Sequence, residues 1–184
     1  MSSATKSDPG PLLEALAWYD EHSRMERAER IAWASSLYQA QGIVAGAVVP
    51  LHLMEEARVS FVNGQFMAVV LSATSVIEHL LIDNLESKQI QGNKSTLAAA
   101  IQCAKRADAF SVQLLDDVDT LRNLRNPLVH KNADAGECSL YERYRKHEVH
   151  PATLLEADAR FALKVMYEFF RSVLKPGGVP NPGA

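Results

Sequence analysis

The residues with the clearest chemical potential lie close together near position 125. Arg125, Asn126 and His130 supply a permanent cation, an amide and an imidazole within one short stretch. Arginine holds an oxyanion with two parallel N–H donors, and histidine exchanges protons near neutral pH because its reference pKa is about 6.5. These residue types predict a site that binds an anion and transfers a proton.

A helix beginning at Val112, capped by Ser111 and ending near Asn126, must position these side chains. At about 100° per residue, one set of apolar side chains falls within roughly 100° of arc and predicts the buried face. The set is Leu114, Val118, Leu121, Leu128 and Val129. Arg125 falls in the middle of this arc, and Arg122 falls at its edge.

A guanidinium on a buried face needs a carboxylate, a partner subunit or a functional cleft, because an unpaired buried charge is costly. Glu78 lies in the otherwise uncharged centre of an earlier apolar helix. We expect it to pair with Arg122 or Arg125. One interpretation is therefore purely structural: Arg125 joins two helices by pairing with Glu78 or another core acid, and His130 caps the end of its own helix.

Pro127 interrupts the helix between the arginine and the histidine. It has no N–H to donate to the carbonyl of Asn123, and its ring crowds that carbonyl, so we expect a kink or an end here. In an unbroken helix Arg125 and His130 would lie about 140° apart around the axis and about 7.5 Å apart along it. A kink, together with the length of arginine, would let the two side chains converge.

The stretch from Arg125 to His130 reads R-N-P-L-V-H and resembles the signature of HEPN domains, a superfamily of all-α modules. The stretches 56–66, 75–81 and 156–170 resemble the helices around that signature, so the likeness covers about residues 51–174. It implies a homodimer or heterodimer whose paired motifs line a cleft. Many such domains are metal-independent endoribonucleases, often toxins or effectors of phage defence. Others are inactive partners, including partners of nucleotidyltransferases.

The resemblance assigns catalytic roles to Arg125, Asn126 and His130, supported by Glu78, Arg122 and Pro127. RNA carries its own nucleophile, the 2′-OH, and its cleavage needs a base, an acid and a phosphate grip. We expect His130 to move protons, Arg125 to hold the phosphate and Asn126 to orient it. The motif contains one histidine per chain, which supplies only one of the two proton-transfer groups. A dimer would supply both, without any metal or other cofactor.

Basic and aromatic residues follow the motif: Lys131, Arg143, Tyr144 and Arg145. We expect either a solvated loop or an extension of an RNA track through phosphate contacts and stacking. Cys138, His147 and His150 invite a zinc interpretation, but their spacing matches no standard site. We therefore expect no metal.

The remaining sequence predicts one all-α domain, a HEPN-like antiparallel bundle of five to six helices with an additional N-terminal helix. Gly and Pro are sparse and β-branched alternation is absent between residues 12 and 174. We expect tails at 1–11 and 175–184, an N-terminal helical extension over 12–50 and the HEPN-like core over 51–174. The expected helices cover residues 12–38, 51–62, 65–86, 97–107, 112–126 and 153–174.

Composition narrows the classes of function. The 184 residues carry a formal net charge of −3, which argues against a nonspecific nucleic-acid coat held by bulk positive charge. Two runs, 31–54 and 59–77, lack charged residues, but their polar residues favour buried helices over membrane spans.

Two cysteines without a CxxC pair favour a reducing, cytoplasmic setting. No nucleotide-binding loop or hydrolase motif is present. The partners expected are RNA, a second copy, and an antitoxin or a nucleotidyltransferase.

Overall fold

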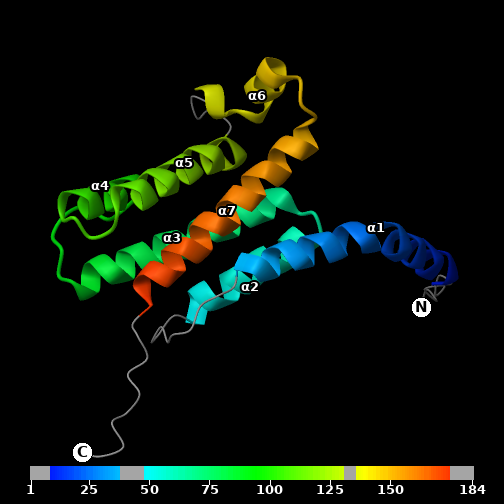
Figure 1. Ribbon diagram of the computed structural model, residues 1–184, viewed down its shortest axis with the longest axis horizontal. Helices are drawn as coiled ribbons and strands as arrows, with labels where there is room; N and C mark the ends of the chain where they lie inside the picture. The colour runs from blue at the N-terminus through cyan, green and yellow to red at the C-terminus, as the bar shows by residue number, and fades with distance from the viewer. Residues whose placement is uncertain (1–8, 38–47, 131–135, 175–184) are drawn as a thin grey trace, which may run out of the picture.

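The computed structural model describes residues 9–37, 48–130 and 136–174 (Figure 1). Its elements within these ranges are all helical: α1 (Gly10–Leu37), α2 (Val48–Val62), α3 (Phe66–Ser87), α4 (Leu97–Arg106), α5 (Val112–Val129), the short 3₁₀ helix η1 (Gly136–Cys138), α6 (Leu140–His147) and α7 (Pro151–Val173). The predicted all-α class is confirmed. Helices α2 to α7 form the bundle that carries the candidate site.

Helix α3 is the centre of the core, as its apolar sequence predicts. It packs mainly against α2 and α7, with α4 and α5 along its remaining side (Figure 1). Nine of its side chains are buried, among them Val69, Ile77 and Leu81. Residues 59–77 therefore lack charge because most of this run lies in or beside the core.

Helix α3 is also the one helix in the described ranges that is long and apolar enough to cross a membrane by length and composition. The core helix of a bundle has the same composition, because it is covered by apolar neighbours on several sides. Its burial beneath α2 and α7 accounts for that composition.

The helix ends follow the predicted signals. Thr96 Oγ1 accepts a hydrogen bond from the N–H of Ala99 at 3.2 Å, and Ser111 Oγ accepts one from Leu114 at 3.3 Å. These side chains satisfy N–H groups that have no partner within their helices. Gly64, at φ +73°, adopts the left-handed conformation that lets the chain turn between α2 and α3.

Three predicted helix limits are wrong by a few residues. Helix α1 begins at Gly10, inside the predicted tail, and α2 begins at Val48 with Pro50 in its first turn, where a missing N–H costs no helical hydrogen bond. Helix α5 continues past Pro127 to Val129. Its final hydrogen bond runs from the N–H of His130 to the carbonyl of Asn126, at 2.9 Å.

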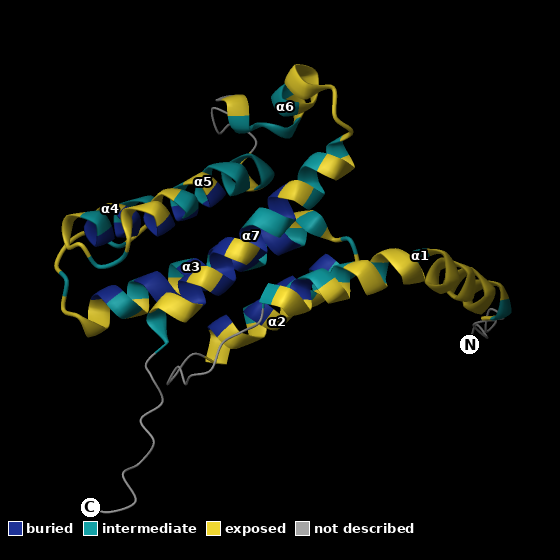
Figure 2. Cartoon of the chain, in the orientation of Figure 1, coloured by how far each residue is buried: buried dark blue, intermediate teal, exposed yellow. Residues whose placement is uncertain are grey.

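Helix α1 is attached to the bundle only through its second half. Figure 2 shows its N-terminal half exposed beyond the other helices. Near its other end, the ring of Trp33 packs at a tilt of 45° against Phe61 of α2, with 5.0 Å between ring centroids, and the Arg160 guanidinium of α7 lies 4.7 Å from the Trp33 ring. Aromatic and cation–π contacts therefore fix the C-terminal half of α1 on the bundle.

Candidate functional site

The candidate site lies at the C-terminal end of α5, where that helix extends past the core. Leu114, Val118 and Leu121 are buried as predicted. Val129 is not: 45% of it is exposed. The predicted buried face is therefore correct through Leu121 and partly correct at Leu128, which is half-buried and packs against the core, and it is wrong at Val129.

Arg125 is half-buried instead of fully buried. It forms no ion pair or hydrogen bond with any residue in the described ranges. Its predicted pairing with Glu78 is absent, since Glu78 likewise has no ion-pair partner there. The structural interpretation of Arg125 as a link between α3 and α5 is therefore wrong. The guanidinium is a fixed positive charge with its donors available to a ligand.

Arg122 is not paired with Glu78 either, because it is engaged along its own helix. Its Nε donates to Asp119 at 2.8 Å, and its Nη2 donates to the side chain of Asn123 at 2.8 Å. With its amide turned to match these neighbours, Asn126 accepts from Arg122 Nη1 at 3.1 Å and donates to the Arg122 carbonyl at 3.2 Å. Arg122 therefore holds Asn126 in place one turn ahead of it.

His130 is exposed and sits at the C-cap of α5. It lines a hollow of about 130 Å³ between the end of α5, α6 and the start of α7, which we call the His130 hollow. Leu124, Cys138, Arg143, Leu155 and Asp158 are among the other residues that line it. Arg125 and Asn126 do not line it. The structure therefore brings His130 together with α6 and α7, and leaves Arg125 outside this hollow.

The strongest polar contact in the His130 hollow is an ion pair between Arg143 of α6 and Asp158 of α7. Arg143 Nη1 donates to Asp158 Oδ2 at 2.6 Å, and Nη2 donates to Oδ1 at 2.7 Å. Both side chains are largely buried, with 18% and 10% of their surfaces exposed. The hydrogen bonds that Arg143 donates to Asp158 raise the pKa of the Arg143 guanidinium, against the opposing effect of burial.

This pairing corrects the expectation that Arg143 contacts RNA. Its guanidinium is occupied by Asp158, so it is a structural tie within the wall of the hollow. Arg145 is exposed but pairs with Glu142 at 3.2 Å, and Tyr144 is 46% exposed. Exposed pairs of this kind open at little cost, so Tyr144 and Arg145 stay candidates for RNA contact. Lys131 lies outside the described residues.

Helix α6 was not predicted from the sequence, because residues 141–146 were expected to form a loop. Ser139 caps it by accepting from the N–H of Glu142 at 3.1 Å, and Glu142 follows the cap by three residues. A serine followed three residues later by glutamate is a capping-box pattern and was the available signal. Asp158 is one of three acidic residues of α7, with Glu156 and Glu168, and no local signal singled it out as the buried one.

Two further observations concern metal ligands and α3, the apolar helix that carries Glu78. Among the residues that the structure describes, no three His, Cys, Asp or Glu side chains come together as a metal site would require. His79, beside Glu78, is exposed. Neither residue of that pair reaches the His130 hollow.

Comparison of the chain with models of protein families, with characterised proteins and with solved structures found no match.

Proposed function

We propose that this chain is a HEPN-type, metal-independent endoribonuclease that acts on RNA as an assembly of two copies. The observation that carries the proposal is Arg125. It is half-buried on α5, has no carboxylate partner within the described ranges, and lies five residues before His130, an exposed histidine beside a hollow. A half-buried cation that no acid of the described residues neutralises favours an anionic ligand, and a phosphodiester is the anion that matches its planar donors.

The proposed reaction uses the nucleophile that RNA carries. The 2′-oxygen attacks the adjacent phosphorus while one His130 accepts the 2′-proton. The bond from phosphorus to the 5′-oxygen breaks, and a second His130, from another copy, donates a proton to that oxygen. Arg125 holds the non-bridging oxygens as their charge grows. The product is a 2′,3′-cyclic phosphate and a free 5′-OH.

Asn126 has a narrower role in this proposal than the motif implies. Its amide is held by Arg122, which leaves fewer free donors for a substrate. We assign it to orienting the scissile phosphate only after the Arg122 contact opens. Arg122 then acts as a positioning residue for Asn126 and for the last turn of α5.

The same contact favours a second candidate function, a catalytically silent HEPN module. Arg125 does not line the hollow that His130 lines, and Asn126 is occupied within the chain. A module of this kind would bind an antitoxin or a nucleotidyltransferase instead of cutting RNA. The proposed cytoplasmic location and role in defence apply to either candidate.

The test is cleavage of mixed RNA by the purified chain in excess chelator. Wild type is expected to cut and to leave cyclic phosphate ends. His130→Ala is expected to lower the rate at least about 100-fold, and Arg125→Met is expected to lower it comparably. His147→Ala is the matched control, since His147 is also an exposed histidine at a helix end. Intact RNA with the wild type, or equal cutting by His130→Ala, contradicts the nuclease and leaves the silent module.

A further inference from the structure

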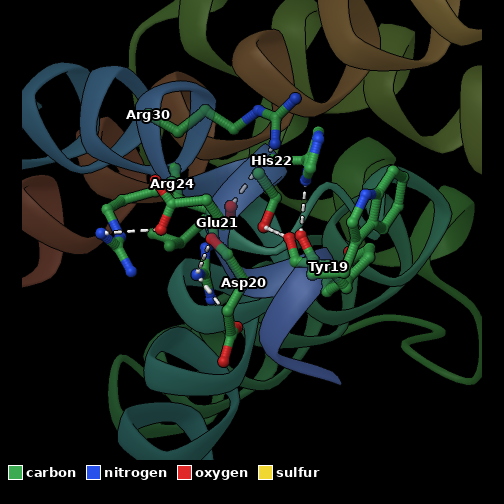
Figure 3. A network of polar contacts seen from close by, with 10 residues as sticks. Tyr19, Asp20, Glu21, His22, Arg24 and Arg30 are labelled. Carbon is green, nitrogen blue, oxygen red and sulfur yellow. Dashed lines mark hydrogen bonds and ion pairs between the residues drawn. The ribbon is translucent and has the colours of Figure 1, made fainter. Parts of the chain in front are cut away.

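Arg30 of α1 is a largely buried cation whose acidic partner is exposed. Only 13% of its side chain is exposed, and its guanidinium lies 5.2 Å from the centroid of the Phe66 ring. Its ion-pair partner Glu26, at 3.0 Å, is 67% exposed (Figure 3). In the Arg143–Asp158 pair, by contrast, both side chains are largely buried. Arg30 is therefore held by a carboxylate that another anion can replace at little cost.

A hollow of about 360 Å³ lies beside Arg30, between α1 and the turn that joins α2 to α3, and we call it the Arg30 hollow. Asn63, Gly64 and Phe66 form its side on the turn. A Cβ at Gly64 would lie 3.3 Å from Arg30 Nη1, so the glycine leaves room for the guanidinium. The same Nη1 donates to the carbonyl of Val62 at 3.5 Å. The volume is at the lower end of the range for small-molecule sites, roughly 300–1,000 Å³.

Aromatic side chains lie at the other end of the Arg30 hollow. Trp18 and Tyr19 both line it, and they are 62% and 54% exposed. His22 also lines it and stacks on Trp18, with 3.9 Å between the ring centroids. Exposed aromatic rings of this kind stack on planar heteroaromatic rings such as nucleobases.

The aromatic end and the cationic end of the hollow lie along one side of α1. Tyr19, Ser23, Glu26 and Arg30 follow one another at intervals of four, three and four residues, so they share one face of the helix. The Arg30 guanidinium reaches back to Glu26, which is seven residues from Tyr19 and thus roughly 10 Å from it along the axis. A ligand that spans this distance would carry a flat ring at one end and an anion at the other.

A nucleoside monophosphate has this arrangement of groups. Its base would stack on Tyr19, and its phosphate would replace Glu26 at Arg30. The ribose between them would lie along Ser23. Arginine binds a phosphate through parallel N–H donors, and the side-chain amide of Asn63 supplies a further donor at the same end. A phosphate offers three acceptor oxygens to these donors, and a carboxylate offers two.

The charges around the hollow favour a single nucleotide over an RNA strand. Residues 10–21 contain Glu14, Asp20 and Glu21 and no Lys or Arg. Arg27 also lines the hollow, but it donates to the carbonyl and the carboxylate of Asp20, at 3.2 Å and 3.1 Å. A strand binds through many phosphate contacts with Lys and Arg, so it would be repelled by this acidic segment. A mononucleotide brings one phosphate, to the arginine end alone.

We propose that the Arg30 hollow binds a nucleoside monophosphate, with its base on Tyr19 and its phosphate on Arg30 in place of Glu26. Most residues of the hollow belong to α1, which lies outside residues 51–174, so the HEPN resemblance does not predict this site. The inference does not depend on the chemistry at His130.

Calorimetric titration of the full chain with AMP tests the inference. Wild type is expected to bind one AMP per chain, more tightly than adenosine or inorganic phosphate, because each of these keeps only one of the two ends. Tyr19→Ala is expected to weaken AMP binding at least about 10-fold through lost stacking. Tyr141→Ala is the matched control and should leave the affinity unchanged, since Tyr141 is a 69% exposed tyrosine outside the hollow.

Glu26→Gln is expected to tighten AMP binding, a result that a purely structural role of the residue would not give. Removing the competing carboxylate frees Arg30 for the phosphate and should raise the affinity about 3-fold, as for loss of an exposed ion pair. Glu21→Gln removes the same charge from the same helix, but Glu21 pairs with Arg24 and does not line the hollow. This control should leave the affinity nearly unchanged.

Two arginine variants separate this hollow from the candidate site on α5. Arg30→Met is expected to weaken AMP binding at least about 10-fold, and Arg125→Met is expected to leave it unchanged. Circular dichroism checks that each variant is folded. The proposal is overturned by a wild type that does not bind AMP, by equal affinity for inorganic phosphate, or by weaker binding in Glu26→Gln. It is also overturned if Arg125→Met abolishes binding and Tyr19→Ala does not. A wild type that cuts no RNA would leave these results unchanged, so the two proposals fail separately.

A single-stranded oligodeoxyadenylate is the last arm, because it lacks the 2′-OH and resists the proposed cleavage. It is expected to bind the Arg30 hollow less tightly than AMP. Tighter binding that Tyr19→Ala weakens would assign the hollow to a nucleic-acid strand and overturn the proposal.

Discussion

Arg143 and Asp158 form a two-pronged ion pair, at 2.6 Å and 2.7 Å, that ties α6 to the start of α7 beside His130. The side chains come from elements separated by the turn between the helices, and both are largely buried. Both residues line the His130 hollow. We therefore expect loss of this pair to disturb the candidate site.

Replacing Asp158 by Ala is expected to lower the free energy of unfolding by about 3 kcal/mol, because it leaves the Arg143 charge buried without a partner. Urea unfolding followed by circular dichroism measures this. Glu21→Ala, which removes an ion pair whose two side chains are 66% and 68% exposed, is the control and should change stability by no more than about 0.5 kcal/mol. Equal effects of the two substitutions would show that the buried pair contributes nothing special.

Arg125 and Arg122 are expected to differ in their contribution to stability. Arg125→Met keeps the apolar stem and removes a half-buried charge that has no ion-pair partner within the described ranges, so stability should stay the same or rise. Arg122→Met removes the hydrogen bonds to Asp119, Asn123 and Asn126 and should cost about 1–2 kcal/mol. The same urea titrations decide this, and a larger loss for Arg125→Met would restore the structural interpretation of that residue.

Gly92 is expected to tolerate no side chain. Its φ is +138°, and a Cβ there would lie 2.5 Å from the Sγ of Cys103. Gly92→Ala should lower stability by about 2 kcal/mol through backbone strain and this clash. Adding Cys103→Ala is expected to relieve the clash but not the strain, so the double variant should recover only part of the loss. Thermal melts of Gly92→Ala, of Cys103→Ala and of the double variant measure the recovery, and an unaffected Gly92→Ala would contradict the close approach.

The Glu55–Arg58 pair of α2 is expected to give a small dependence of stability on acidic pH. The hydrogen bond from Arg58 lowers the pKa of the Glu55 carboxyl below its ordinary value of 4.5. Because the folded-state pKa is the lower one, this contribution is present above the unfolded value and is lost as the pH falls through the folded value. The free energy of unfolding, measured between about pH 6 and pH 3, should therefore fall less steeply with decreasing pH for Glu55→Gln than for wild type. An identical slope would show that the pair does not stabilise the fold.

Much of the fold follows from local sequence patterns. The uncharged run before Glu78 predicted the central helix, and Thr96 and Ser111 predicted the starts of α4 and α5, because a cap and an apolar period act within a few residues. Helix α6 escaped prediction because its short, charged sequence has no apolar period. Its capping serine was the only strong local sign.

The sequence by itself determined the all-α class, the central helix, and the presence of an arginine and a histidine that resemble a ribonuclease motif. Only the tertiary structure decided which charges are paired. The positions of the two arginines on α5 pointed to Glu78 as the partner of Arg122 or Arg125. Instead, Arg122 is paired within its own helix, and Arg143 of α6 is paired with Asp158 of α7. Arg125 has neither kind of contact among the described residues. Pairing depends on which helices meet and where the cover of the core ends, and these are relationships between segments that no local pattern contains.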